Sequence, residues 1–531
     1  MKTLFILLDT LVRNSLECYN QFSPYISTAN KTKIPTPNIS RLAQKSICFD
    51  NHYVGSLPCM PARRDMMTGR LNFMHSSWGC LEPYDNSFAR ILRNETNVHS
   101  HLITDHPHYF ANGGFGYHTC FDVWDFKRGQ EGDSQYSYLH VSPSEFKNKY
   151  HPKYYPTEDG SRRLNSRTSH ILNRECLMND DESQYPLVQC IEAAKKFLDT
   201  NHDQKDWLLQ LECFDPHEPY TAMKKYREKL DIAEEIVIDW PQYDRRTEDD
   251  ETRDTISKNY MALVMMIDDY LGEIFDKLDE YNLWDDTCVI LTTDHGILLG
   301  EHEWWGKNRQ AYYQEIAHIP LIFYHPDYKD QAGTRRQSIT TTIDLMPTLL
   351  ELNGAEIPEE VTGQSILPLL KQESGEKRTV IYGMFGGAIS ICDTEYTYFL
   401  YPNHMDSADD LFEYTLMPEN IHRPMSLESL RHMELVEPFD FTKDIQLLKI
   451  SADKRYSLRI PYDRFDDTAG FGENKTRLFN IKNDPQQLTE IHEKETEYRL
   501  KQQITQHLIK HDAPKECYTR FGLSAFVKQG E

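Results

Sequence analysis

The residues best suited to chemistry stand close together in the stretch from Cys59 to Arg70. Pro61 near its start and Gly69 near its end are typical of a short helix with a left-handed C-terminal cap. Cys59 would then lie at the helix N-terminus, where free N–H groups and the helix dipole favour an anion. Arg63, one turn further on, could present its guanidinium to the same anion. An isolated cysteine in such a place is more often a buried residue of a capping loop, so the interpretation depends on the rest of the chain.

Four short apolar segments elsewhere in the chain each lead into a turn with an acid, and three of these turns also hold a histidine. The segments are Thr3–Leu8, His99–Thr104, Trp207–Cys213 and Cys288–Thr293. Continuous apolar runs of this length are typical of strands that are covered on both faces, as in a mostly parallel α/β sheet. Ligands of such sheets bind beyond the carboxyl ends of the strands. We therefore expect the four strands to deliver Asp and His side chains to one edge of a sheet.

The remaining patterns predict an α/β protein with a second, smaller domain. Apolar residues recur at helical spacing from Tyr260 to Leu278, which predicts a long amphipathic core helix. The polar segment 134–186 and the acidic segment 236–254 have no strong period and are interpreted as loops or insertions over the sheet edge. After a charged linker, short strand-like segments and a terminal helix indicate an antiparallel sheet. We predict a catalytic domain over residues 1–375, with a large, mostly parallel sheet sandwiched by helices, and a C-terminal α+β domain over residues 376–531.

Composition and charge limit the partners and the compartment. The chain has 531 residues, of which 39% are apolar, as expected for a soluble enzyme with a large core. A formal net charge of -25 argues against nucleic acid and an anionic membrane surface as binding partners. The apolar start ends at Asp9, and no later run is long enough for a membrane span. Eleven scattered cysteines fit a reducing cytoplasm, which is the predicted location.

The cysteine stretch carries a family resemblance. The pattern C-x-P-x-R at Cys59 to Arg63, followed by Thr68-Gly69-Arg70, closely resembles the signature of the type I sulfatases in the alkaline-phosphatase-like superfamily. Further segments resemble landmarks of that family in the same order: Thr36-Pro37-Asn38, Phe214-Asp215-Pro216-His217, Thr293-Asp294-His295-Gly296, Leu299-Gly300-Glu301-His302, Trp305-Gly306-Lys307 and Asn483-Asp484-Pro485.

The resemblance implies a modified cysteine and a partner that makes it. Cys59 would be converted after synthesis to formylglycine, whose hydrated form is the nucleophile of the family. The conversion requires a maturation enzyme, either a formylglycine-generating enzyme or an anaerobic sulfatase-maturating enzyme. Ala62 stands where most members have serine, a change that many relatives tolerate, including phosphonate and phosphodiester hydrolases.

The resemblance also implies a metal site formed by Asp9, Asp294, His295 and the modified Cys59 side chain. This oxygen-rich set suits one divalent cation, with calcium preferred and manganese, magnesium or zinc as alternatives. Thr10 follows Asp9, where many relatives have a second acid. The pattern therefore predicts a metal site without selecting a single metal.

Three further residues complete the predicted catalytic set with Cys59. Arg63 and Lys307 are expected to contact the cysteine-derived nucleophile and the sulfate oxygens. His217 follows a strand and is flanked by prolines that stiffen its loop. By resemblance it contacts the scissile oxygen and protonates the leaving alcohol, for which the pKa of a histidine is suited.

The expected substrate-binding residues include a second departure from the family. Many sulfatases have a G-K-W-H motif after the strand at 99–104, whereas this chain has Thr104-Asp105-His106-Pro107-His108-Tyr109 and lacks the lysine. His106 or His108 either supplies the lost positive charge or is a loop histidine, and the sequence leaves both open. Nearby aromatic and charged residues are of the kind found in sugar-contacting loops. The predicted substrate-binding set is Thr10, Asp105, His106, His108 and Arg128.

The leading prediction is hydrolysis of a small-molecule sulfate monoester, with a carbohydrate as the expected substrate. The nearest alternative uses the same site on phosphonate monoesters or phosphodiesters, which Ala62, Thr10 and the Asp294-His295 pair keep open. A third interpretation, from another class, is a catalytically silent ligand-binding homologue. Homo-oligomer formation is left open.

Overall fold

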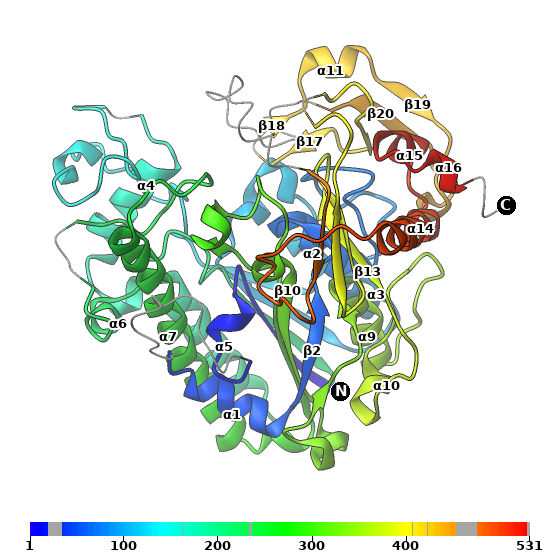
Figure 1. Ribbon diagram of the computed structural model, residues 1–531. Coiled ribbons are helices and arrows are strands. Elements are labelled where there is room, and N and C mark those ends of the chain that lie inside the picture. Colours follow the sequence, from blue (N-terminus) through cyan, green and yellow to red (C-terminus); the bar gives the residue numbers. More distant parts are fainter. Residues whose placement is uncertain are drawn as a thin grey trace.

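A nine-stranded sheet runs through the centre of the molecule (Figure 1). The computed structural model describes residues 1–19, 34–161, 163–232, 236–405, 407–421, 423–452 and 475–527. The strand order is β11-β2-β10-β7-β1-β6-β4-β5, and β12 also pairs with β2. The strands are β1 (Lys2–Leu8), β2 (Ile47–Tyr53), β4 (His99–Thr104), β5 (Val123–Phe126), β6 (Trp207–Cys213), β7 (Thr287–Thr293), β10 (His318–Tyr324), β11 (Arg335–Arg336) and β12 (Thr340–Thr341). Of these strands, β10 is antiparallel to both of its neighbours and the other pairs are parallel, which confirms the predicted sheet type.

The register of the central strands explains why acidic residues meet at one edge. Leu8 at the end of β1 lies opposite Cys213 of β6 and Thr293 of β7. Each of these three strands therefore ends at the same level, and the residues that follow leave the sheet together. The four predicted apolar segments are all strands of this sheet.

Helices cover both faces of the sheet, and the alternation of β1 side chains shows it. Leu4, Ile6 and Leu8 belong to one buried core with residues of α1 (Pro37–Lys45), α5 (Pro186–Asn201) and α7 (Asp250–Glu280). Phe5 and Leu7 point to the opposite face, where they join a second core. That core includes residues of α2 (Cys59–Thr68), α3 (Phe88–Glu95), α9 (Leu345–Leu352) and α10 (Leu367–Lys371).

The predicted insertions carry more helix than the sequence indicated. The acidic segment 236–254 was expected to be loop, but α7 already begins at Asp250. The side chain of Asp249 accepts the N–H of Thr252 at 2.8 Å, and acids in the first turn are favoured by the helix dipole. The polar segment 134–186 similarly contains α4 (Ser166–Leu172), which is capped by Asn165.

The C-terminal part is built on a five-stranded, mostly antiparallel sheet in the order β21-β15-β14-β13-β3. Its strands are β21 (Arg477–Asn480), β15 (Tyr396–Leu400), β14 (Ile389–Cys392), β13 (Val380–Met384) and β3 (Ser56–Leu57). The short β3 comes from the N-terminal part and pairs with β13 just before α2 begins. The predicted antiparallel sheet and the terminal helix, α14 (Lys494–Lys510), are confirmed, and the fold class with them. The boundary at residue 375 stays a prediction, and residues 528–531 lie outside the described part.

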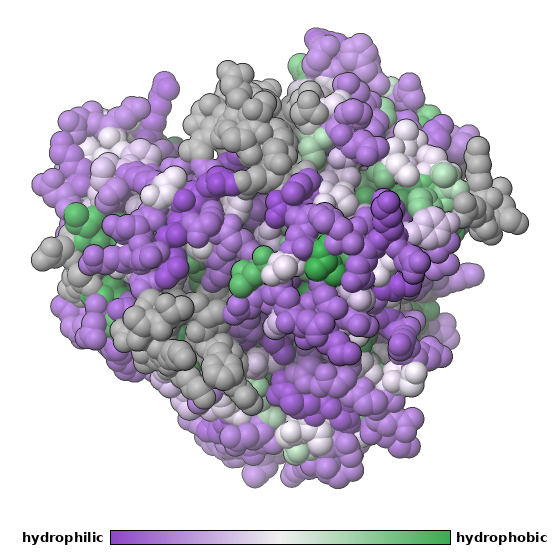
Figure 2. Space-filling view, viewed as in Figure 1, coloured by the Kyte–Doolittle hydropathy of each residue, from purple (hydrophilic) through white to green (hydrophobic). Residues whose placement is uncertain are grey.

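Shorter elements complete the described chain. They are α6 (Lys224–Glu228), α8 (Gln314–Ala317), α11 (Leu427–Arg431), α15 (Lys515–Arg520), α16 (Ser524–Val527), the three-stranded sheet of β16 (Phe412–Thr415), β20 (Leu447–Ser451) and β19 (Glu434–Val436), and the pairs β8 (Leu298–Leu299) with β9 (Trp305–Gly306) and β17 (Glu419–Asn420) with β18 (Arg423–Pro424). Figure 2 shows a face on which hydrophilic residues predominate. Among the described residues, no helix has both the length and the apolar character that a membrane crossing requires.

Candidate active site

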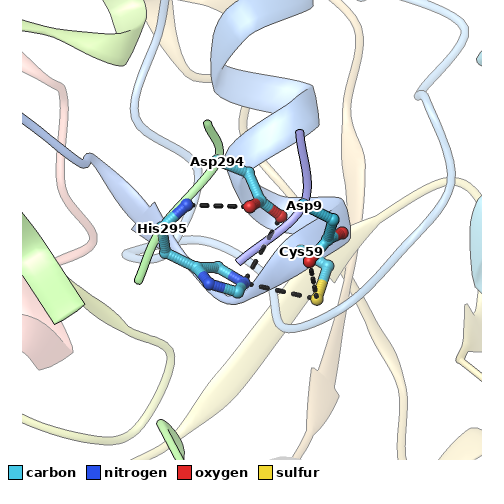
Figure 3. Close-up of side chains that lie close together, drawn as sticks. All are labelled: Asp9, Cys59, Asp294 and His295. Carbon is cyan, nitrogen blue, oxygen red and sulfur yellow. Dashed lines mark hydrogen bonds and ion pairs between the residues drawn. The ribbon is translucent and has the colours of Figure 1, made fainter. Parts of the chain in front are cut away.

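Four side chains from three distant segments meet at the carboxyl edge of the sheet (Figure 3). Asp9 follows β1, Asp294 and His295 follow β7, and Cys59 is the first residue of α2. One ligand atom from each lies within 4.8 Å of the others, and all four residues are buried. The structure therefore brings together the whole predicted metal set.

Cys59 lies inside this cluster, in surroundings that disfavour its thiolate form. Its Sγ is 3.3 Å from Nε2 of His295 and 3.9 Å from Oδ1 of Asp9. Burial, and after it the charge of Asp9, raises the pKa of the thiol well above its usual value. Because the thiolate is the nucleophilic form, the unmodified cysteine is poorly suited to attack an ester. The helix that carries it ends as predicted at Gly69, which has a left-handed φ of 67°.

His295 presents an unprotonated nitrogen to the cluster. Its Nδ1 lies 3.0 Å from the carbonyl oxygen of Gly296, which can only accept, so Nδ1 carries the proton. Nε2 then faces Cys59 and lies 3.3 Å from Oδ2 of Asp294. A backbone contact that fixes the tautomer in this way is typical of metal-binding histidines.

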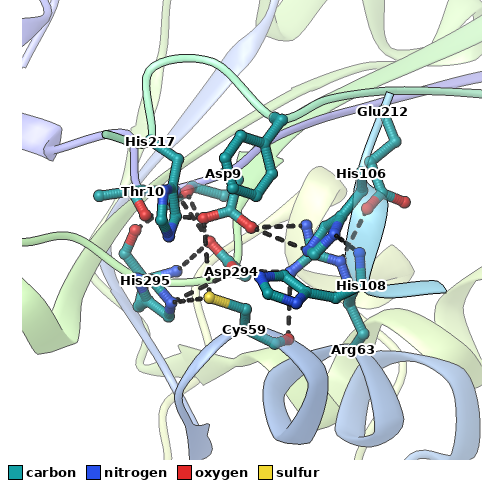
Figure 4. A network of polar contacts seen from close by, with 12 residues as sticks. Asp9, Thr10, Cys59, Arg63, His106, His108, Glu212, His217, Asp294 and His295 are labelled. Atoms are coloured by element: carbon teal, nitrogen blue, oxygen red, sulfur yellow. Dashed lines mark hydrogen bonds and ion pairs between the residues drawn. The ribbon is translucent and has the colours of Figure 1, made fainter. Parts of the chain in front are cut away.

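Arg63 is the central cation of the site (Figure 4). Its guanidinium lies 2.9 Å from Asp9, 2.7 Å from Asp294 and 2.7 Å from Glu212, and it also donates to the carbonyl oxygen of Cys59 at 3.0 Å. Burial alone would lower the pKa of Arg63, but the three carboxylates hold it well above its usual value. Three carboxylates surround one guanidinium, which leaves an excess of negative charge.

This excess fits a divalent cation. Oδ2 of Asp9 is buried and, among the described residues, accepts no hydrogen bond of good geometry, although Arg63 and His106 lie within 3.3 Å. Burial, followed by the charge of Asp9, raises the pKa of Asp294 to about 7, so a second negative charge is unfavourable without a cation. Two carboxylates and an imidazole nitrogen are a suitable donor set for the predicted ion.

Thr10 links Lys307 to the cluster. Nζ of Lys307, which follows β9, donates to Oγ1 of Thr10 at 2.8 Å, and that hydroxyl donates to Oδ1 of Asp9 at 2.7 Å. The N–H of Thr10 donates to Oδ1 of Asp294 at 3.0 Å. Thr10 has a φ of 63°, which is rare for a β-branched residue. The missing second acid is thus replaced by a hydroxyl that joins a lysine to a carboxylate.

The two histidines after β4 have different neighbours. Nε2 of His106 lies 3.3 Å from Oδ2 of Asp9, while its Nδ1 accepts the N–H of His108 at 3.2 Å. Burial, and after it the charge of Arg63, lowers the pKa of His106 to about 4, which favours a neutral imidazole beside Asp9. Nε2 of His108 lies 3.4 Å from a carboxylate oxygen of Glu131. The roles of His106 and His108 in substrate binding stay predictions.

Asp105 and Arg128 lie outside the cluster. Asp105 accepts the N–H of Phe214 at 2.6 Å and the side-chain amide of Gln130 at 2.9 Å, which ties the turn after β4 to the turn after β6. Arg128 is 47% exposed and forms an ion pair with Asp133. Their role in substrate binding stays a prediction.

Several site residues were missed by the sequence reasoning. Glu212 is fully buried within β6 and binds both Arg63 and the hydroxyl of Tyr109, the latter at 2.8 Å. A carboxylate inside an otherwise apolar strand was the available signal, because buried acids are rare unless paired. Glu218, which contacts His217, and Tyr243, which contacts Glu218, carried no comparable signal. Nδ1 of His217 lies 2.7 Å from the carbonyl oxygen of Glu218, so its Nε2 is the nitrogen available to a substrate.

Comparison with known proteins identifies the family. The sheet and the helices that cover it have the alkaline-phosphatase-like fold of the structural neighbours. The sulfatase family model matches residues 2–355 of this chain. The chain therefore belongs to the sulfatase family and is a sulfuric ester hydrolase.

Individual relatives are distant but cover most of the chain. Multifunctional alkaline phosphatase superfamily protein PehA of Trinickia caryophylli is 26% identical, with 66% of this chain and 74% of that protein covered. N-acetylglucosamine-6-O-sulfatase of Bacteroides thetaiotaomicron is 24% identical, with 70% and 71% covered.

Solved structures confirm the fold. One in complex with its substrate D-glucosamine-2-N,6-O-disulfate superposes with a TM-score of 0.62 at 15% identity and covers 97% of this chain and 99% of that one. Phosphonate monoester hydrolase of Agrobacterium radiobacter superposes with a TM-score of 0.59 at 16% identity, with 96% and 95% covered.

Proposed function

We propose that this sulfatase hydrolyses a sulfate monoester of a carbohydrate with a formylglycine made from Cys59. The observation that carries the proposal is the place of Cys59, which begins α2 inside a buried cluster of Asp9, Asp294 and His295. The carbohydrate substrate is supported by the similarity to N-acetylglucosamine-6-O-sulfatase.

One divalent metal, preferentially calcium, would be held by Asp9, Asp294, His295 and the modified Cys59 side chain. It would supply Lewis acidity and neutralise charge on the sulfate group. Manganese, magnesium and zinc are the alternatives, since the set includes a histidine.

The remaining catalytic roles fall to the protein's own cations and to His217. Arg63 holds Asp9 and Asp294 in place, and Lys307 reaches Asp9 through the hydroxyl of Thr10. We assign to both cations the stabilisation of negative charge on the sulfate oxygens. Nε2 of His217, protonated, would donate to the leaving oxygen as its bond to sulfur breaks.

The proposal is tested at Cys59. Peptide mass spectrometry of protein produced with a maturation enzyme should show a loss of about 18 mass units at this residue. Cys59→Ala should lose turnover of aryl sulfates, and Cys59→Ser should also fail to turn over. Full activity of Cys59→Ala would overturn the proposal. Comparing kcat/KM for aryl sulfates and aryl phosphonate esters separates the sulfatase from the phosphonate monoester hydrolase alternative.

Metal binding should depend on pH through Asp294. Its carboxyl group, with a pKa raised to about 7 by burial and by Asp9, must lose its proton before it can bind a cation. The apparent affinity for calcium should therefore weaken by up to about tenfold per pH unit below that pKa and level off above it. Calorimetry on chelator-treated enzyme in buffers of different ionisation enthalpy measures both the affinity and the released proton. An affinity that stays constant from about pH 5.5 to about pH 8 would count against this assignment.

We also propose a cytoplasmic location and a maturation enzyme as partner. All eleven cysteines are free of disulfide bonds, and such usage is typical of a reducing compartment. Expression with and without a formylglycine-generating or anaerobic sulfatase-maturating enzyme, followed by the peptide analysis above, tests the partner.

A further inference from the structure

The acidic segment that was expected to be a loop over the sheet edge lies along the hairpin that delivers Lys307. The N–H of Trp305 donates to the carbonyl oxygen of Asp244 at 2.8 Å, and the N–H of Arg246 donates to that of Glu303 at 2.8 Å. These two contacts lie on either side of Arg245, directly after Tyr243, and fix the segment against β9 and the residues that precede it. Residues far apart in sequence are thus joined next to the catalytic lysine.

This contact places Tyr243 next to both Lys307 and Glu218. A Cβ atom on Gly306 would lie 2.5 Å from the Tyr243 ring, so glycine is required for the ring to lie where it does. The ring centroid is 5.9 Å from Nζ of Lys307. The Tyr243 hydroxyl donates a short hydrogen bond to Oε1 of Glu218.

Glu218 in turn faces His217. The residue is only 2% exposed, and its Oε2 lies 3.5 Å from Nδ1 of His217 with no hydrogen bond to any other described residue. Nδ1 of His217 also lies 2.7 Å from the carbonyl oxygen of Glu218. Two acceptor oxygens of one residue therefore face Nδ1, which keeps a proton there and directs Nε2 away from Glu218. Figure 4 shows His217 beside Asp9 and Thr10.

We propose that Glu218 is a positioning residue for His217, and that Tyr243 holds Glu218 and Lys307 in their working places. The proposal rests on the function proposed above, in which His217 protonates the leaving group. The proton on Nε2 passes to the ester oxygen as the sulfur–oxygen bond breaks, the electron pair of that bond stays on the oxygen, and the sulfur bonds to the nucleophile made from Cys59. The alcohol then leaves uncharged, and His217 keeps the Nδ1 proton that faces Glu218. A carboxylate beside Nδ1 stabilises the charged imidazolium that precedes this transfer.

The test uses sulfate esters whose leaving groups differ in pKa. An ester of an acidic phenol needs little protonation of its leaving oxygen, whereas an ester of an aliphatic alcohol needs much. Glu218→Gln should lower kcat/KM by less than about threefold for 4-nitrophenyl sulfate and by about 30-fold to 100-fold for alkyl or sugar sulfates. Tyr243→Phe, which removes one oxygen, should show the same trend with a loss of about fivefold to 20-fold on the alkyl esters.

Tyr150→Phe is the matched control. Like Tyr243, Tyr150 has a hydroxyl that donates to a carboxylate, that of Glu175 at 2.9 Å, and Tyr150 itself is buried. Removing the Tyr150 hydroxyl should change kcat/KM equally, and by little, for all esters. Formylglycine content and thermal stability are measured for each variant. If Glu218→Gln does not fold, the kinetics of the milder Tyr243→Phe variant test the inference.

A double-mutant cycle separates positioning from structure. If Glu218 acts through His217, adding His217→Asn to Glu218→Gln should cost much less on alkyl sulfates than His217→Asn alone costs in the native enzyme. Equal losses on phenyl and alkyl esters, or additive losses in the cycle, would overturn the inference while leaving the sulfatase function intact. A native enzyme that turns over none of the esters would instead contradict the proposed function.

Discussion

At the scale of single residues, Thr10 stands where the family resemblance led us to expect a second acid. Its hydroxyl joins Lys307 to Asp9, and its backbone is held in a left-handed conformation with a φ of 63°. Thr10→Val preserves the branched shape and removes only the hydroxyl. Hydrogen bonds to charged groups contribute roughly 1.5–3 kcal/mol each, so kcat/KM for a sulfate ester should fall by about 10-fold to 100-fold. Thr10→Ser, which keeps the hydroxyl, should stay within about threefold of the native enzyme. Equal kinetics for the valine and serine variants would contradict this role.

The site residues that sequence predicted are those with a local signal. Asp9, Asp294 and His295 each follow an apolar strand, and the parallel sheet then places them together. Glu212 belongs to the same site but lies inside its strand, where its pairing with Arg63 becomes visible only in three dimensions. The contacts of Tyr243 depend on how an irregular segment folds over the sheet, which no periodicity encodes.

At the scale of elements, the end of α2 is expected to need Gly69 for two reasons, its backbone conformation and the close packing around it. Its φ is 67°, and a Cβ there would lie 2.7 Å from a methyl group of Val361 and 3.0 Å from the sulfur of Met346. Gly354, near the end of α9, has a similar φ of 74° but open space around the Cβ position. Gly354→Ala should cost about 1–2 kcal/mol of unfolding free energy, for conformational strain alone. Gly69→Ala should cost about 1–3 kcal/mol more because of overpacking. Urea denaturation measures the free energy of unfolding of both variants. Equal decreases would show that the neighbours of Gly69 can move to make room for a methyl group.

Helix ends were predictable from sequence where proline, glycine or acidic residues occur at them. Pro61 and Gly69 correctly indicated α2, and the expected terminal helix is α14. The start of α7 was missed because its first turns are acidic and polar. Those residues suit the helix dipole but have no apolar period, and the cap at Asp249 was the signal that could have located the boundary.

At the scale of the whole molecule, the predicted domains are joined more closely than their sequence order suggests. β3 lies in the C-terminal sheet although it precedes α2. Nε2 of His75 donates to the carbonyl oxygen of Asp512 at 2.8 Å, and Nδ1 of His511 lies 3.2 Å from the hydroxyl of Thr362. These contacts join residues more than a hundred positions apart, so no local pattern could predict them.

The histidines at this junction should make stability depend on pH. Burial lowers the pKa of His75 to about 3 and the pKa of His511 well below its usual value of 6.5. Between these values and 6.5 the unfolded chain binds more protons than the folded one, so stability is full above pH 6.5 and falls as the pH drops below it. Each histidine should contribute a slope of up to about 1.4 kcal/mol per pH unit.

Urea denaturation of His75→Gln between about pH 5 and about pH 7 tests this dependence. Glutamine retains an N–H that can donate to Asp512 but does not titrate, so the free energy of unfolding should fall less steeply toward acid than in the native protein. His492→Gln is the comparison variant, because the His492 side chain is 82% exposed. If both variants had the same slope as the native protein, His75 would contribute nothing to acid sensitivity. A reduced slope in His75→Gln alone would show that the buried imidazole of His75 makes the junction sensitive to acid.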